Sequence, residues 1–367
     1  MTTPFPVLRL PYLVLMPILE QMEFMERITL SVLSKRARMF VKLLKMKCKH
    51  INLRLEYNTV KMNVCFDNDE ELSVDMYTDR LKVNLKHGKD HISWWPGSLP
   101  PMDYVLPIMD VTHCKSIKKL IFPKVYEYDP AYDTTIPLLT KLPKVDEVIV
   151  EDFTSYIFSP DSPLRNVLRI ILPVSSAVTI SDHVRKPKYL REIFKGNFDA
   201  VNVQLLGDND WRFPLNDLRK TNAKTLKLDS VAFKVEDLNL YFKLWMKKKC
   251  NPRLEYLSVR QEGNVNKNLL LKGLNAVPVP IETKRTFRIS GNVEQLGWGE
   301  RIVVEFDITR ADRRQATIRI GTHGTVCFYV WPESTNDTTN LVPNQFSFMR
   351  RFSFSSTFYN SFIERFK

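Results

Sequence analysis

Apolar residues in the first fifty positions repeat with the period of a helix, in three short segments. The first segment repeats at Leu15, Ile18, Leu19 and Met22. Spacings of three and four residues place these side chains on one helical face. Pro17 lies in this segment, and proline leaves a helix unbroken only in its first turn. A second segment spans residues 24–33, and a third follows Ser34, a residue type favoured as an N-cap. The pattern therefore predicts three short helices.

From residue 51 the helical period changes to an alternation of apolar and polar residues. The alternating stretches are 51–57, 61–66, 71–77 and 81–86. Such alternation is typical of half-buried strands. Residues 87–101 then contain glycine, proline and the Trp94–Trp95 pair, a composition typical of a turn or linker. We expect short antiparallel strands up to residue 86, followed by a corner.

Between residues 101 and 260 a helical stretch repeatedly precedes a short apolar strand. The expected helices cover 104–113, 137–142, 188–194, 214–221 and 236–248. The expected strands cover 118–122, 146–150, 166–172, 200–205, 224–228 and 254–259. Successive strand centres are 22 to 33 residues apart, which is near the length of a leucine-rich repeat but less regular. This rhythm predicts a parallel sheet backed by helices on one side, in an irregular leucine-rich-repeat-like solenoid.

Residues 285–331 return to alternating strands, separated by the turn sequences ADRR and GTHG. We expect them to form a small antiparallel cap, so that the whole chain mixes α/β and α+β organisation. Beyond Pro332 the chain becomes polar and then rich in phenylalanine, with seven of its 22 Phe residues between 346 and 367. Three interpretations of this tail stay open: packing on the preceding domain, insertion at a membrane surface, and no role.

The net charge of +13 at pH 7 is concentrated in two parts of the chain. Residues 1–50 hold nine basic and three acidic residues, and residues 201–300 hold 17 and 11, so each part carries +6. The first excess follows the third expected helix at Lys35, Arg38, Lys42, Lys45 and Lys49. It is open to three interpretations: a solvated helix face, electrostatic steering toward an acidic partner, and binding to nucleic acid or an anionic membrane.

The second basic excess is densest at Lys247, Lys248, Lys249 and Arg253. Lysines at a helix C-terminus interact favourably with the helix dipole, which is a purely structural role. Contact with an acidic segment of a substrate is the functional alternative. Residues 51–200, between the two excesses, carry a slight net negative charge. This distribution fits local docking surfaces better than a continuous track for phosphates.

The residue types needed for catalysis form no recognisable motif in this sequence. It lacks a Walker loop and the patterns GxGxxG, GxSxG and HExxH, and only 11 of its 367 residues are glycine. Its five cysteines form no CxxC pair, which favours a reducing compartment. No uninterrupted run of 18 apolar residues predicts a transmembrane helix. We expect an intracellular protein, cytoplasmic or nuclear, without catalytic, cofactor-binding or metal-binding residues.

Two groups of short motifs have spacings that a known family shares. The first group joins Leu10–Pro11, Ile18–Leu19 eight residues later and the run Ser31–Arg36. The second group joins Trp245 and the run Asn251–Leu257. The first group resembles an F-box, and the second resembles the F-box-associated domain of the second type. Proteins that combine these two domains are abundant in nematodes.

The resemblance implies a division of the chain into four parts. These are an F-box at 1–50, a short β-strand region with a Trp/Pro corner at 51–100, a leucine-rich-repeat-like F-box-associated domain at 101–332, and a tail at 333–367. The likeness is strongest over residues 180–332. Pro17 departs from the family, which usually has a helix former there, and the Phe-rich tail has no family counterpart.

The resemblance also implies a function, as a substrate-receptor subunit of a Skp–cullin–F-box ubiquitin ligase. The F-box would dock onto a Skp-type adaptor, which links it to a cullin–RING ligase, and the second domain would recruit a protein target. A three-helix module is too small to bury its apolar faces alone. The expected adaptor contacts are therefore Leu10, Pro11, Leu15, Ile18, Leu19 and Val32. The alternative is that these residues pack on the following domain.

The basic residues supply the candidate contacts with a partner or substrate. They are Lys35, Arg38, Lys42, Lys247, Lys248, Lys249 and Arg253. Ligase chemistry would come from the cullin–RING partners, because the chain lacks the paired zinc ligands of a RING. The alternative function is a binding module without ligase coupling, which recognises nucleic acid or acidic protein through its basic patches. The identity of the target has no linear signature in the sequence.

Overall fold

The computed structural model describes most of the chain up to Pro332. The described residues are 7–56, 58–95, 100–123, 136–151, 163–182, 193–205, 214–229, 233–260, 264–280, 285–289, 292–294 and 300–332. The chain divides into two units, Met1–Trp331 and Pro332–Lys367. The Phe-rich tail, residues 346–367, lies outside the described residues. Every helix and strand named below belongs to the first unit.

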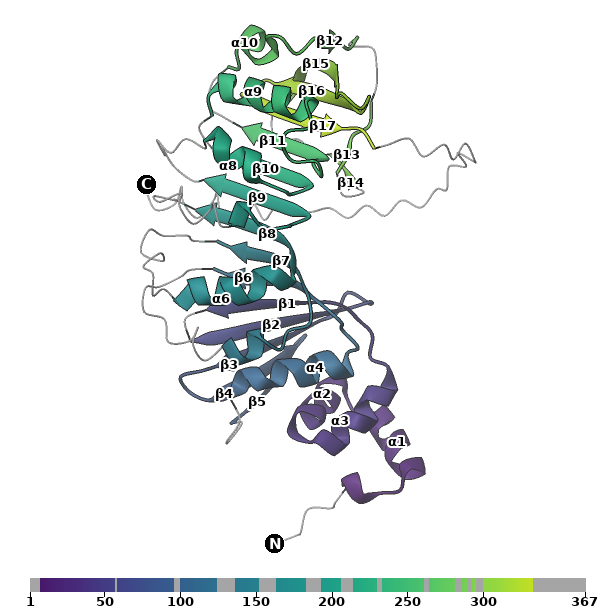
Figure 1. Cartoon of the computed structure of the whole chain (residues 1–367). Helices are drawn as coiled ribbons and strands as arrows, with labels where there is room; N and C mark the ends of the chain where they lie inside the picture. The colour runs from purple at the N-terminus through teal and green to yellow at the C-terminus, as the bar shows by residue number, and fades with distance from the viewer. Residues whose placement is uncertain are drawn as a thin grey trace, which may run out of the picture. The chain divides into compact units, whose positions relative to one another are not determined.

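The N-terminal part is a group of short helices, as its periodicity predicts (Figure 1). Its elements are η1 (Val7–Arg9), α1 (Tyr12–Gln21), α2 (Phe24–Leu33), α3 (Lys35–Val41) and η2 (Lys42–Leu44). A capping box between Glu23 and Glu26 begins α2. The Ser34 hydroxyl begins α3, where it accepts a hydrogen bond of 3.3 Å from the Ala37 amide. The three predicted helices are confirmed.

Two details of these helices differ from the prediction. Pro17 is the sixth residue of α1 rather than a residue of its first turn. The helix therefore lacks the hydrogen bond that an amide at this position would donate to Leu13. The third helix is also shorter than expected, because Lys45 follows η2 with a left-handed φ of 51°. Lys49 belongs to the first strand, so the basic residues between 35 and 49 do not share one helix.

The next part of the chain forms five antiparallel strands. They are β1 (Cys48–Glu56), β2 (Thr59–Phe66), β3 (Glu71–Tyr77), β4 (Lys82–His87) and β5 (Asp90–Trp94). Each pairs with the next in antiparallel order, which confirms the prediction for residues 51–86. The corner expected at 87–101 is wrong in its first half, because residues 90–94 pair with β4. Trp94 is half-buried at the end of that strand, whereas Trp95 is exposed.

Six parallel strands follow in chain order. They are β6 (Ile117–Phe122), β7 (Val145–Val150), β8 (Ser175–Asp182), β9 (Ala200–Leu205), β10 (Thr225–Asp229) and β11 (Tyr256–Arg260). Each pairs in parallel with the next, and β6 also pairs in parallel with β1. The strand expected at 166–172 is wrong, because most of this segment is helix α6 (Pro163–Ile171) and the strand is β8. A short apolar run fits either structure.

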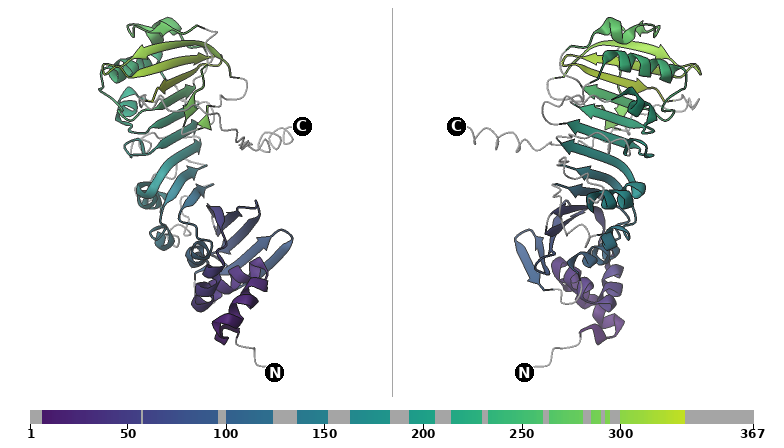
Figure 2. Two further views of the ribbon diagram at one scale, coloured as in Figure 1. Left: turned by 90° about the vertical axis from the view of Figure 1, so that its right-hand side faces the viewer. Right: turned by 60° about the vertical axis from the view of Figure 1, so that its left-hand side comes forward.

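Helices connect the parallel strands across one face of the sheet. They include η3 (Pro101–Tyr104), α4 (Val105–Val111), α6, η5 (Leu172–Val174), α8 (Leu215–Lys220) and α9 (Val235–Met246). Connections between parallel strands are right-handed, so strands added in sequential order keep their helices on one face. Figures 1 and 2 show α6, α8 and α9 on this common face. After β11 the chain forms one more short helix, α10 (Lys267–Leu271).

A continuous row of apolar residues lies on the helix-covered face. Its members, each opposite the next, are Leu53, Leu120, Val148, Val178, Val201, Leu226, Leu257, Phe328 and Ile318. All of them are buried. Trp245 of α9 packs edge-on against Phe328, with their ring centroids 4.9 Å apart. The core therefore lies between the helices and this face of the sheet.

The last strands continue the same sheet in antiparallel order. They are β12 (Val277–Pro278), β15 (Ile302–Thr309), β16 (Gln315–Gly321) and β17 (Thr325–Val330), and β17 pairs with β11. A separate two-stranded sheet joins β13 (Arg288–Ile289) and β14 (Asn292–Val293). The antiparallel strands expected in this region are present at the end of the parallel strands, and within the described residues they belong to the same 15-stranded sheet. The leucine-rich-repeat-like solenoid stays a prediction.

Candidate functional site

Several large apolar side chains of the N-terminal helices are exposed to solvent. They are Tyr12, Leu13 and Val14 of α1, Leu33 of α2, Met39 of α3 and Leu43 of η2. Leu13 is 83% exposed and Met39 is 70% exposed. Single exposed apolar residues are common, whereas several on neighbouring helices mark an interaction surface. We call these six residues the exposed helical surface.

One contact between aromatic rings joins α1 to α3 within this surface. The Tyr12 ring lies 6.2 Å from the Phe40 ring of α3. Leu13 follows Tyr12 in α1, and Met39 precedes Phe40 in α3. Helix α1 begins directly after Pro11, whose φ of −55° suits a helix start. The ring contact therefore joins the beginning of α1 to α3, and each of these helices carries an exposed apolar side chain beside it in sequence.

The six residues expected to contact an adaptor fall into two groups. Those that keep exposed surface are Leu10, Pro11 and Ile18. Leu15, Leu19 and Val32 are buried within the chain itself, with exposed fractions of 0, 0 and 5%. Contact of these three residues with an adaptor stays a prediction, and so does the alternative that they serve only to pack within the chain.

The basic residues of the first excess are partly engaged within the chain. The Arg38 guanidinium donates to the Ser31 carbonyl at 3.1 Å. Lys42 forms an ion pair of 2.5 Å with Asp110 of α4. Lys35 is exposed at the start of α3. Arg38 and Lys42 therefore connect neighbouring helices, and the basic residues do not form an unbroken basic face.

The second basic cluster also has acidic partners. Lys248 lies beyond the end of α9 with a left-handed φ of 59° and pairs with Asp312 at 3.3 Å. Arg253 pairs with Asp199 at 3.1 Å. The lysines of the cluster that are exposed are Lys247, Lys248 and Lys249. Asp312 also pairs with Arg310, and Asp199 also pairs with Lys224. Each aspartate therefore offsets only part of the positive charge around it, and the cluster stays basic.

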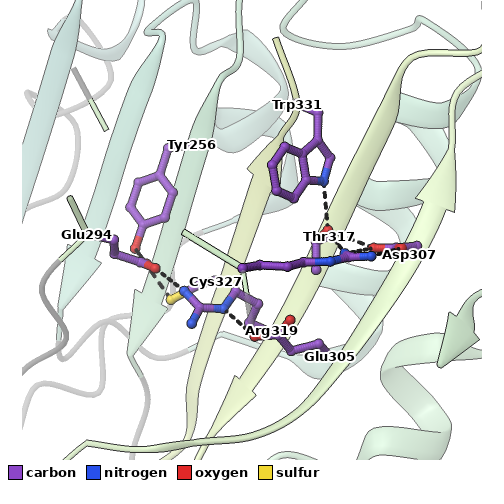
Figure 3. A network of polar contacts seen from close by, with 9 residues as sticks. Tyr256, Glu294, Glu305, Asp307, Thr317, Arg319, Cys327 and Trp331 are labelled. Carbon is purple, nitrogen blue, oxygen red and sulfur yellow. Dashed lines mark hydrogen bonds and ion pairs between the residues drawn. The ribbon is translucent and has the colours of Figure 1, made fainter. Parts of the chain in front are cut away.

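A group of charged side chains crosses the last strands, on the sheet face opposite α9 (Figure 3). Arg319 of β16 pairs with Glu305 of β15 at 3.0 Å and also with Glu294. The Tyr256 hydroxyl donates to Glu294 at 2.6 Å. Burial raises the pKa of Tyr256, so the hydroxyl keeps its proton and remains a donor. The strand register explains the arrangement, because Glu305 lies directly opposite Arg319.

Asp307 of β15 forms a second ion pair beside the first. Arg285 donates two hydrogen bonds to its carboxylate, of 2.7 and 2.9 Å. Thr317, opposite Asp307 in β16, donates a third of 2.7 Å, and accepts one of 2.9 Å from the Trp331 indole. Burial favours the neutral acid, but the hydrogen bonds outweigh it and lower the pKa of Asp307. We call these charged residues the polar network; their internal pairing makes them a structural element, not a free binding site.

Sequence reasoning missed the polar network, although part of its signal is present. Glu305 and Asp307 are two residues apart, as are Thr317 and Arg319. Residues two apart share one face of a strand, and opposite charges on paired strands stabilise their register. The pairing of Arg285 with Asp307 cannot be predicted in this way, because Arg285 lies outside both strands.

Metal ligands and membrane-spanning helices are not found in the part of the chain that the structure describes. Within those ranges, no group of three or more His, Cys, Asp or Glu side chains is arranged to hold a metal ion. No helix there combines the length and the apolar character needed to cross a membrane.

Comparisons with known proteins identify two segments of the chain. Residues 7–49 match the family model described as F-box domain. Residues 189–259 match the model described as F-box associated. No curated protein and no solved structure matches the chain. The exposed helical surface lies entirely within the first matched segment, and the polar network lies mostly beyond the second.

Proposed function

We propose that this chain, which carries an N-terminal F-box and an F-box-associated segment, is a substrate-receptor subunit of a Skp–cullin–F-box ubiquitin ligase. Its F-box docks onto a Skp-type adaptor, and its sheet-bearing part holds a protein target. The cullin–RING partners supply the catalysis. The chain contributes proximity, because it holds a lysine of the target near the conjugating enzyme. Such a role places the protein in the cytoplasm or the nucleus.

The exposed helical surface is the observation that carries this proposal. Leu13 and Met39 are large, apolar and mostly exposed, and they lie on two helices that the Tyr12–Phe40 contact joins. Burying one such side chain on a partner contributes about 1.5–3 kcal/mol. The packing of the chain leaves these side chains outside its core, so they are available to an adaptor.

The residues expected to bind the adaptor then take two different roles. Leu10, Pro11 and Ile18 keep exposed area, and we propose them as direct contacts at the edge of the exposed helical surface. The buried residues Leu15, Leu19 and Val32 act indirectly, because they hold α1 and α2 in position.

The division into domains is part of the same proposal. The boundary at residue 50 falls inside β1 (Cys48–Glu56), so the F-box helices pass directly into the sheet. The boundary at residue 100 lies between strands that belong to one sheet. We therefore propose that 51–332 acts as one sheet-bearing part in target recruitment, with the tail at 333–367 as a separate segment.

Calorimetric titration with a purified Skp-type adaptor tests the docking surface. Leu13→Ser removes the most exposed apolar side chain of α1. We expect the Kd of the complex to rise at least about tenfold, which corresponds to about 1.4 kcal/mol. Leu240→Ser is the matched control, because Leu240 is an exposed leucine of α9 at 44%. An equal effect of both substitutions, or no binding by the unaltered chain, would contradict the proposal.

Recognition of nucleic acid through the basic patches is the weaker alternative. Lys42, Lys248 and Arg253 each pair with an aspartate of the chain, which reduces the charge available to phosphates. A salt titration separates the two functions, because phosphate contacts make the logarithm of affinity fall steeply and linearly with the logarithm of salt concentration.

A further inference from the structure

Two cysteines lie side by side where the N-terminal helices meet the sheet. Cys48 is the first residue of β1, and Cys114 lies three residues before the start of β6. The two strands pair in parallel, with Ile51 opposite Ile117. Cys48 lies three residues before Ile51, and Cys114 lies three residues before Ile117. The ladder begins at this pair of isoleucines, so the two cysteines lie just before it, where their side chains come within hydrogen-bonding distance of each other.

The two thiols interact directly with each other. The Cys48 thiol hydrogen-bonds to the Cys114 sulfur, and this bond lowers the pKa of Cys114 to about 7 although burial opposes the shift. The same interaction, followed by burial, raises the pKa of Cys48. The Cys114 thiol itself donates a hydrogen bond of 3.1 Å to the Ser116 carbonyl oxygen. The interaction between the two thiols thus favours ionisation of Cys114 over ionisation of Cys48.

Cys114 also lines a surface cavity of about 380 Å³. The other polar residues around this cavity are Lys42, Asp110, His113, Lys115 and Lys141. A partly exposed thiolate is the reactive form of cysteine. Hydrogen bonds favour the Cys114 thiolate by lowering its pKa, whereas the charge of Asp146 opposes it. The cavity therefore gives a small oxidant access to the sulfur of Cys114.

The remaining cysteines provide a contrast within the same chain. Cys250 and Cys327 are buried, and burial raises the pKa of each thiol to about 12. Thiols of this kind are inert. Cys65 lies on β2 near Cys48, and burial raises its pKa as well. Among the five cysteines, Cys114 alone combines a lowered pKa with a place on the cavity.

We propose that Cys114 is a peroxide-reactive thiol and that Cys48 is its resolving thiol. In the first step the Cys114 thiolate attacks hydrogen peroxide and the O–O bond breaks. The hydroxide that leaves takes up a proton from solvent, so the products are a sulfenic acid and water. In the second step the Cys48 sulfur attacks the sulfenic sulfur, and a second water leaves as the S–S bond forms. The two thiols lose two electrons together, and peroxide gains them. A dithiol reverses the modification.

The disulfide would fix the connection between the F-box helices and the sheet. Lys42 of η2 already pairs with Asp110 of α4, and His113 Nε2 lies 2.9 Å from the Lys42 carbonyl oxygen. A covalent bond from Cys48 of β1 to Cys114 adds a crosslink close to these contacts. This modification is independent of the proposed ligase function.

Peptide mapping of the full chain tests the proposal. The reduced protein is treated with hydrogen peroxide, alkylated, and digested without reductant. We expect one intramolecular disulfide, between Cys48 and Cys114, that dithiothreitol removes. In Cys48→Ser the sulfenic acid persists, so dimedone labels Cys114. In the matched control Cys250→Ser the Cys48–Cys114 disulfide forms as in the unaltered chain.

Two results would overturn the proposal. One is a disulfide between Cys48 and Cys65 as the main product, which Cys65→Ser would abolish. The other comes from the unaltered chain, so it does not depend on how a variant folds. At pH 7 we expect iodoacetamide to alkylate Cys114 at least about tenfold faster than Cys250; equal rates would show that Cys114 is not activated.

Discussion

At the scale of single residues, the polar network shows how pairing stabilises charged side chains that are buried. The side chain of Arg319 is 11% exposed, and that of its partner Glu294 is 4% exposed. Charges buried to this extent cost several kcal/mol unless they are paired. Arg319 meets two carboxylates and also lies 4.0 Å from the centre of the Phe287 ring. It thereby connects β15 and β16 to the segment that contains β13 and β14.

Arg319→Met removes the cation at the centre of the polar network. Glu294 and Glu305 then lose their shared partner while they stay largely buried. We expect the free energy of unfolding to fall by about 3 kcal/mol, measured by urea denaturation. Lys144→Met is the control, because Lys144 and Asp146 form an exposed pair that is worth less than about 1 kcal/mol. Equal denaturation midpoints for the two variants would contradict this role of Arg319.

At the scale of elements, periodicity predicted most helices and strands, and its errors have physical causes. The segment 166–172 is apolar enough for a strand, but most of it belongs to α6, because a run of this length fits both structures. Residues 90–94 contain polar residues near a glycine, and they become β5 only because β4 offers an edge to pair with. Pairing between distant segments is not visible in local sequence.

The candidate site was predictable only in part. The helical spacing of Leu15 and Leu19 correctly marks one face of α1, but it does not say whether that face meets this chain or a partner. The structure shows that it meets this chain. The exposed run Tyr12–Val14 has no helical periodicity of its own, so Leu13 could not be selected from the sequence pattern.

Pro17 allows a test at the element scale. It is the sixth residue of α1 and donates no backbone hydrogen bond. We expect Pro17→Ala to raise the free energy of unfolding by about 1–3 kcal/mol, measured by urea denaturation. Pro11→Ala is the control, because Pro11 precedes the helix and its missing amide costs the helix nothing. A loss of stability in Pro17→Ala would show that α1 depends on its proline.

At the scale of the described molecule, the sheet explains how the parts work together. The apolar row from Leu53 to Ile318 crosses parallel and antiparallel strands without interruption. The F-box helices attach to this body through α4, where Lys42 pairs with Asp110. Their inner face is buried by this attachment, and the exposed helical surface remains for a partner. This division between an inner and an outer helical face is the basis of the proposed function.

Hydrogen exchange of the full chain, with and without a purified Skp-type adaptor, tests the central claim most directly. We expect the adaptor to slow exchange in α1, α3 and η2, which carry most of the exposed helical surface. Exchange in α9 and β15–β17 is expected to stay the same. Protection at Lys247–Arg253, or no protection anywhere, would contradict docking through the F-box helices.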